Sequence, residues 1–181
     1  DPLSYFRGDR DLIQEAERVQ RDLAGIKVFF ITLEAEDERA FLEPDNLRKL
    51  VEIQAFLDKQ GIFDRSLSLA DFLQVANREF HGGDPDYHRV PAKRELVAQY
   101  LLFFHRNDVD SYVSHDYRRA NIVVRHNVTD SATLNRHVNE LRQVVEEVAG
   151  AELKGFVVGE NLMINAAADS LIGAQVNSLG I

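Results

Sequence analysis

The sequence predicts an α+β domain with a ferredoxin-like split β-α-β layer, in which helices pack on one face of a four-stranded antiparallel sheet. Three observations predict it. Four apolar runs are too short to be helices, and the members of each successive pair are separated by a long amphipathic helix. A further helical stretch lies at the midpoint, between the two pairs. Two right-handed β-α-β units of this kind close into one sheet, an architecture that hosts many functions and selects none.

The predicted strands are rich in β-branched and aromatic residues, which favour a pleated, buried surface. They cover residues 27–33, 62–67, 119–126 and 153–158. The acidic stretch Glu34–Glu38 ends the first strand. It is typical of a solvated loop, because calcium loops alternate their carboxylates with Gly and Asn.

The two helices of the layer are predicted from apolar residues at helical spacing and from their end signals. Residues 47–60 follow Pro44-Asp45-Asn46 and end before Gly61, and residues 131–149 follow Asp130 and end before Gly150. Their apolar stripes are Leu47, Leu50, Val51 and Ala55 in the first helix, and Leu134, Val138, Leu141, Val145 and Val148 in the second. Two more helices are expected outside the layer, over residues 11–23 and 161–181.

A helical insertion of about residues 69–106 is predicted between the second and third strands. Ser68, with Asp71 three residues later, forms a capping-box pattern that starts a helix over 69–80. Pro91 suits the first turn of a second helix over 91–105, since its missing N–H costs nothing there. The loop 81–86 joins the two helices.

The composition favours one folded domain over residues 1–181. The chain has 45% hydrophobic and 28% charged residues, and a formal net charge of −9 at pH 7. The negative charge argues against a nucleic-acid partner. The chain has no Cys, which excludes disulfides, cysteine zinc sites and thiol catalysis. No run is long and apolar enough to span a bilayer. Because it starts at Asp1 without Met and stops inside a helical pattern, we expect a piece of a longer protein.

No catalytic or cofactor motif is present, so we expect no enzyme activity, no cofactor and no metal. Glycine-rich phosphate loops, His-Glu-x-x-His and Gly-x-Ser-x-Gly are all missing from the sequence. His81 and His88, with the acidic residues between them, could suggest a metal site, but the Gly-Gly-Asp-Pro sequence there favours a turn. Ser114, His115 and Asp116 are triad residue types, yet three consecutive residues cannot face one another as a triad requires.

Seven segments, in this order along the chain, resemble the periplasmic loop of RND-superfamily exporters, in the MMPL-like or hopanoid-exporter-like branch. They are Asp1–Phe6, Leu42–Leu47, Arg65–Leu73, Gly83–Tyr87, Val97–Leu102, Asp116–Ala120 and Gly173–Leu179. The opening segment is more similar to the loop after the seventh membrane helix than to the loop after the first.

The resemblance implies a porter domain at the periplasmic face of the bacterial inner membrane, inside a proton-driven exporter of lipid or other hydrophobic molecules. Its partners would be the membrane helices of the same polypeptide, a hydrophobic substrate and other copies in an oligomer of the full transporter. The proton-carrying acids of that family lie in membrane helices, so the resemblance assigns no such role to a residue of this chain. Both termini are expected to emerge on the same side of the domain, and residues 161–181 to form a membrane-proximal helix.

A substrate groove is expected where the inserted helices meet the sheet. Its candidate residues are the aromatic side chains Phe72, Phe80, Tyr100, Phe103 and Phe104. The alternative is that these side chains are the core of the insertion, because aromatic stripes at helical spacing usually face inward. Two other functions stay open: a stand-alone ferredoxin-like ligand-binding or regulatory module, and an enzyme that uses Asp116, His115 or the His81 loop.

Overall fold

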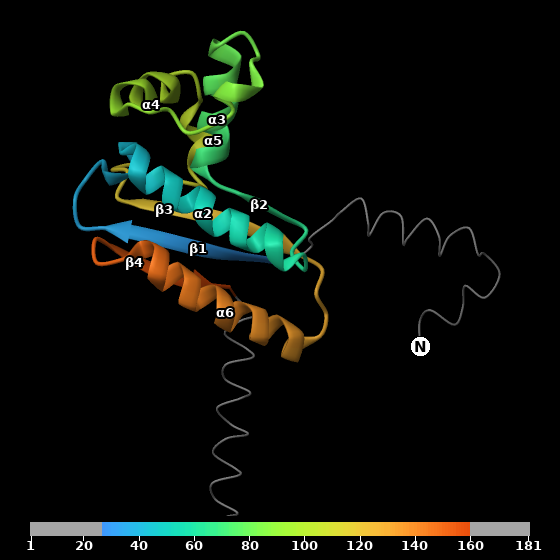
Figure 1. Ribbon diagram of the computed structural model, residues 1–181. Coiled ribbons are helices and arrows are strands. Elements are labelled where there is room, and N and C mark those ends of the chain that lie inside the picture. The colour runs from blue at the N-terminus through green and yellow to red at the C-terminus, as the bar shows by residue number, and fades with distance from the viewer. Residues whose placement is uncertain (1–26, 160–181) are drawn as a thin grey trace, which may run out of the picture.

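The computed structural model describes residues 27–159. The helices predicted over 11–23 and 161–181 lie outside the described residues, as do both chain termini. Figure 1 shows a sheet with two long helices packed along it, and a smaller group of helices above them.

The four strands form a single antiparallel sheet in the order β2-β3-β1-β4. They are β1 (Lys27–Ala35), β2 (Arg65–Leu67), β3 (Arg119–His126) and β4 (Leu153–Val158). The predicted ferredoxin-like layout is confirmed. The prediction for the second strand was too long, because residues 62–64 lie outside the ladder apart from Asp64, whose N–H donates to the Arg125 carbonyl (2.9 Å).

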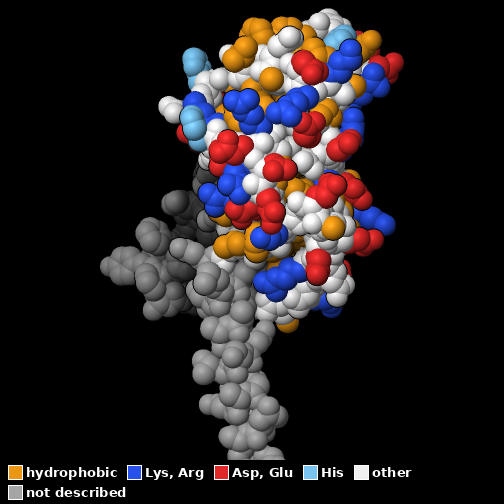
Figure 2. All heavy atoms as spheres, turned by 90° about the vertical axis from the view of Figure 1, so that its left-hand side faces the viewer, with side chains coloured by type: hydrophobic (Ala, Val, Ile, Leu, Met, Phe, Trp, Pro, Cys, Tyr) orange, Lys and Arg blue, Asp and Glu red, His pale blue; other side chains and the backbone are white. Residues whose placement is uncertain are grey.

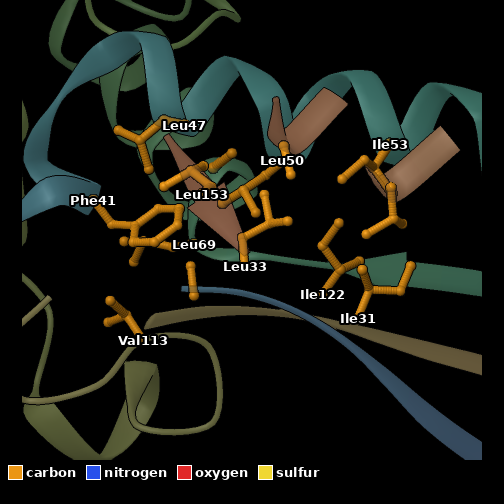
Figure 3. Packing of buried hydrophobic residues seen from close by; sticks show 14 of the residues in the cluster. Ile31, Leu33, Phe41, Leu47, Leu50, Ile53, Leu69, Val113, Ile122 and Leu153 are labelled. Carbon is orange, nitrogen blue, oxygen red and sulfur yellow. The ribbon is translucent and has the colours of Figure 1, made fainter. Parts of the chain in front are cut away.

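One face of the sheet is covered by α2 (Pro44–Gln60) and α6 (Ser131–Ala149). The buried side chains of α2 point at the odd-numbered residues of β1 and at β3, as Leu47, Leu50 and Ile53 do in Figure 3. The opposite face is left partly open: Val28, Phe30, Phe156 and Val158 are 36% to 48% exposed. The fold is therefore two-layered, with its core on one side of the sheet.

The apolar stripe predicted for α2 was partly wrong. Leu47 and Leu50 are buried, but the buried face continues through Ile53, Gln54 and Leu57 rather than through Val51 and Ala55. Ala55 is exposed, and Val51 is only half-buried. The stripe of α6 was predicted more closely, with Leu134, Val138, Leu141 and Val145 buried and Val148 half-buried.

The insertion leaves the sheet after β2 and returns to it at β3. It contains α3 (Leu69–Phe80), the short 3₁₀ helix η3 (Pro85–Tyr87), α4 (Arg94–Leu101) and α5 (Arg106–Val109). The prediction of one helix over 91–105 was wrong. Pro91 is buried ahead of the helix, and a turn at Leu102 and Phe103 separates α4 from α5.

The described chain begins and ends at the same end of the sheet. β1 starts at Lys27 and β4 ends at Val158, which pairs with Phe30. Gly159 follows so close to β1 that an added Cβ would lie 2.7 Å from the Phe29 Cβ. The insertion joins the other end, where β2 ends and β3 starts. Within residues 27–159, no helix has both the length and the apolar content needed to cross a bilayer.

Candidate functional site

A buried polar cluster fixes the start of the insertion against α2. Ser68 caps α3, and its side chain and that of Asp71 form the predicted capping box. Gln54 of α2 completes the cluster: its amide donates to Asp71 Oδ2 (2.9 Å), and its Oε1 accepts from the Ser68 hydroxyl (2.8 Å). Ser68 is fully buried and Gln54 is 8% exposed, so these bonds lie largely out of water and resist competition from it.

A second polar anchor holds the loop between α3 and α4. Asn77, 4% exposed, donates to the carbonyls of Tyr87 (2.9 Å) and Arg89 (3.1 Å). Its Oδ1 accepts from the Tyr100 hydroxyl (3.2 Å). The loop is therefore tied to both helices by one side chain, which keeps the chain before α4 out of the helix.

The five predicted groove aromatics fall into two clusters. The inner aromatic cluster comprises Phe72, Phe104 and Tyr112: the ring of Phe72 lies 5.7 Å from that of Phe104 and 5.0 Å from that of Tyr112. Its members are half-buried and lie where the insertion meets β3. Tyr112 was missed by sequence reasoning, because it lies in a stretch that lacks any helical or strand pattern.

The outer aromatic cluster comprises Phe80, Tyr100 and Phe103 at the ends of α3 and α4. Phe80 stacks on Tyr100 at 4.9 Å and lies 4.8 Å from Phe103. Tyr100 is buried, whereas Phe80 is 53% and Phe103 is 67% exposed. Figure 2 shows hydrophobic side chains gathered at the top of the molecule, over the insertion.

An apolar groove of about 580 Å³ lies between α2 and the insertion. Its lining combines small apolar side chains with a polar rim: Arg48, Val51, Glu52, Ala55, Gln74, Arg89, Val90 and Ala92. A smaller, more polar pocket of about 290 Å³ shares Val51, Ala55 and Gln74 with it and reaches the Gln54 cluster. None of the five predicted aromatic residues lines either pocket, so their role in substrate binding stays a prediction.

The other candidate residues serve local structure. His81 Nδ1 lies 2.7 Å from the Asn77 carbonyl, and its ring stacks on Tyr87 at 3.6 Å. Asp84 accepts from the Asp86 N–H and caps η3. Among residues 27–159, no three His, Asp or Glu side chains are grouped so that they could hold a metal ion.

Ser114 and Asp116 build the turn that leads into β3. The Ser114 hydroxyl donates to Asp116 Oδ1 (2.6 Å) and accepts from the Arg119 N–H (3.0 Å). The bond from Ser114, together with the Arg118 N–H, lowers the pKa of the exposed Asp116 carboxyl. His115 points to solvent beside them. The hydroxyl and carboxylate thus close a turn, with the proton of the hydroxyl directed at the acid.

His126, at the end of β3, is a buried titratable group that sequence reasoning did not single out. It is 1% exposed and lies beside Phe29 and Phe63, with ring-centre distances of 5.7 and 6.3 Å. Burial lowers its pKa, the Lys27 ammonium lowers it further, and Asp64 opposes the shift. Its imidazole is therefore held neutral inside the sheet layer.

Compared with protein-family models, with curated proteins and with solved structures, the chain gives no match. The described residues offer an apolar groove, exposed aromatic side chains and polar anchors between α2 and the insertion. Apolar grooves with a few polar groups are common sites of ligand binding.

Proposed function

We propose that this chain is the periplasmic porter domain of a proton-driven RND-type exporter, in the MMPL-like or hopanoid-exporter-like branch, that transports lipid or other hydrophobic molecules. Its role is conformational rather than catalytic: it forms part of the substrate path and moves when the membrane domain exchanges protons. The sequence resemblance that motivates the proposal runs through seven segments in a constant order.

The structural observation that supports it best is the common end at which the chain enters β1 and leaves β4. A loop between two membrane helices must start and finish at the same membrane face. Lys27 and Gly159 lie at one end of the sheet, and the insertion joins the other. In this arrangement the insertion and its outer aromatic cluster point away from the bilayer.

Four of the segments that resemble the exporter family lie where one helix, strand or loop connects to the next. Such positions suit a domain that changes conformation during transport. Leu42–Leu47 starts α2, Arg65–Leu73 contains the Ser68 cap, Gly83–Tyr87 forms the anchored loop, and Asp116–Ala120 forms the turn into β3. Glu43 also pairs with Arg94 of the insertion (2.5 Å).

The complete gene provides the first test. We expect apolar stretches of about 20 residues shortly before residue 1 and after residue 181. A start codon next to Asp1 or a stop codon after Ile181 would contradict the proposal.

A labelling experiment on the complete protein provides the second. Because residues 1–181 contain no Cys, a Glu147→Cys variant carries a single thiol in this region, on the exposed face of α6. A membrane-impermeant maleimide should label it in cells whose outer membrane alone has been permeabilised. Leu141→Cys, fully buried on the same helix, is the matched unreactive control. Labelling that requires lysis of the inner membrane would overturn the periplasmic location.

A further inference from the structure

Strand β4 is an edge of the sheet whose outer side has no partner strand among residues 27–159. All six of its residues pair with β1 on the inner side. On the outer side, every second residue directs its N–H and C=O away from β1. The opposite edge, β2, has only three residues and runs directly into the insertion. Within residues 27–159, β4 is therefore the longer of the two edge strands.

β4 lacks most of the devices that usually prevent an edge strand from pairing. It contains no Pro, and its register with β1 is continuous from Phe30–Val158 to Ala35–Leu153, so no bulge twists it away. Lys154 is its one charged residue. Phe156 and Val158 are 45% and 48% exposed beside the free edge.

A groove of about 610 Å³ runs along this edge, between β4 and the C-terminal half of α6. Its apolar lining includes Val145, Ala149, Leu153 and Val157, and Arg142 and Glu146 lie on its helical rim. α6 lies close to the strand at Gly155, where an added Cβ would lie 2.5 Å from Val145 Cγ1. The groove thus follows the same edge at which β4 is free to pair.

The rim carries one positive and one negative side chain, so the rim of one copy can pair with the rim of a second copy. Arg142 and Glu146 are one helical turn apart and both exposed. Arg142 donates to the neutral Asn139 side chain (3.0 Å), and Glu146 has no charged partner among the described residues. If a twofold axis passes between them, each Arg142 meets Glu146 of the second copy, and the reverse pair forms as well.

The same axis fits the strand. Val144 lies midway between Arg142 and Glu146 along α6. The next residue, Val145, packs against β4 at Gly155. In an antiparallel β4–β4 pair with Phe156 opposite Phe156 of the second copy, the twofold axis passes through Phe156. This position is one residue from Gly155, so the strands and the rim charges can share one axis. In this register the two exposed phenyl rings become a cross-strand pair, an arrangement that stabilises sheets.

We propose that β4 is a self-association edge: two copies of this chain pair their β4 strands antiparallel about a twofold axis and join their four-stranded sheets into one continuous sheet. The occupant of the groove is the α6–β4 edge of a second copy. This inference does not rest on the proposed function, because it uses only the edge, the groove and the rim charges.

The test is a charge swap, measured by sedimentation equilibrium on the 181-residue chain. Arg142→Glu and Glu146→Arg each set like charges against each other and should raise the dimer dissociation constant about tenfold. The double variant R142E/E146R restores both pairs and should return the constant to within about twofold of the starting value. Glu147→Arg makes the same charge change on the solvent side of α6 and should leave association unchanged.

Hydrogen exchange identifies the edge. Amides of residues 153–158 that do not bond to β1 should gain protection as protein concentration rises, and should not gain it in R142E at the same concentrations. A chain that stays monomeric up to about 1 mM would overturn the inference, as would a dimer that the double variant weakens more than either single variant does. Circular dichroism of each variant excludes unfolding as the cause.

Discussion

The sheet layer and the insertion differ in how completely their large apolar side chains are buried. In the layer, aliphatic side chains such as Ile31, Leu33 and Leu141 are fully buried between the sheet and its two helices. In the insertion, Leu69, Leu73 and Val97 are also fully buried and belong to the same apolar cluster. Phe80 and Phe103, however, remain more than half exposed, and buried polar residues add contacts at the ends of α3. Gln54 and Ser68 fix one end of α3, and Asn77 fixes the loop that follows it.

This difference separates global from local stability. The close-packed core of a domain unfolds as a unit, whereas a part that leaves large apolar side chains exposed can open at a lower free energy. We therefore expect the outer part of the insertion to open before the layer does.

Truncation in the layer should cost the most. Leu141→Ala removes a fully buried side chain of α6 and should lower the free energy of unfolding by about 3 kcal/mol. Urea denaturation followed by far-ultraviolet circular dichroism measures it. A loss below about 1 kcal/mol would mean that the layer is loosely packed at α6.

Loss of the polar anchor should loosen the insertion without melting the layer. Gln54→Ala leaves the buried Ser68 hydroxyl and the Asp71 carboxylate short of partners, at a cost of about 2 kcal/mol. Hydrogen exchange should accelerate in residues 69–80 and stay slow in β1. Gln74→Ala, the same substitution at a half-buried residue that lines the groove, should leave exchange in both regions unchanged. Equal acceleration in both regions would show that the two parts open together.

Acid should weaken the layer through His126. The folded state holds the pKa of His126 below the ordinary 6.5, so the unfolded state binds more protons as the pH falls below that value. The stabilisation is complete above about pH 6.5 and is lost as the pH falls through the lower, folded-state pKa. His126→Phe keeps an aromatic ring beside Phe29 and Phe63, and it should flatten the dependence of unfolding free energy on pH between about 7 and 5. The free energy of unfolding of each protein is compared with its own value at pH 8, which removes any change that does not depend on pH. If His126→Phe leaves the slope of unfolding free energy against pH unchanged, other groups cause the acid sensitivity.

Truncation at the tip of the insertion should have the smallest effect. Leu102→Ala makes the same chemical change as Leu141→Ala, but at a side chain that is 85% exposed. The free energy of unfolding should change by less than about 0.5 kcal/mol. A loss comparable to that of Leu141→Ala would show that the tip is covered in solution and would break the contrast between the two regions.

Sequence patterns predicted the sheet layer well, because apolar residues repeat along each of its strands and helices with the spacing of that one element. Alternation along β3 and the four-three spacing in α6 each define a buried face by themselves, and glycines mark the ends of both long helices. The polar side of the core was not predictable in this way. Gln54 occupies a buried position of α2 because Ser68 and Asp71, distant in sequence, supply its partners.

The insertion shows where local patterns stop being informative. Pro91 suits a helix start, but Asn77 binds the Tyr87 and Arg89 carbonyls ahead of it, and α4 begins only at Arg94. The five aromatic residues expected at one groove fall into two clusters, and Tyr112 joins the inner one. Tertiary contacts that cross the loop decide both outcomes.

The common end at which β1 begins and β4 finishes also determines how the domain responds to mechanical load. Tension that separates the two flanks acts along the hydrogen bonds between these neighbouring antiparallel strands, and it breaks them in sequence from Val158 toward Leu153. A load applied between Lys27 and Glu152 would instead run along the strands and strain the whole ladder at once. Optical-tweezer handles at residues 27 and 159 should therefore unfold the domain at a lower force than handles at 27 and 152. The hydrogen bonds between β1 and β4 are therefore expected to break one after another, starting at the end of the sheet where β1 begins and β4 finishes.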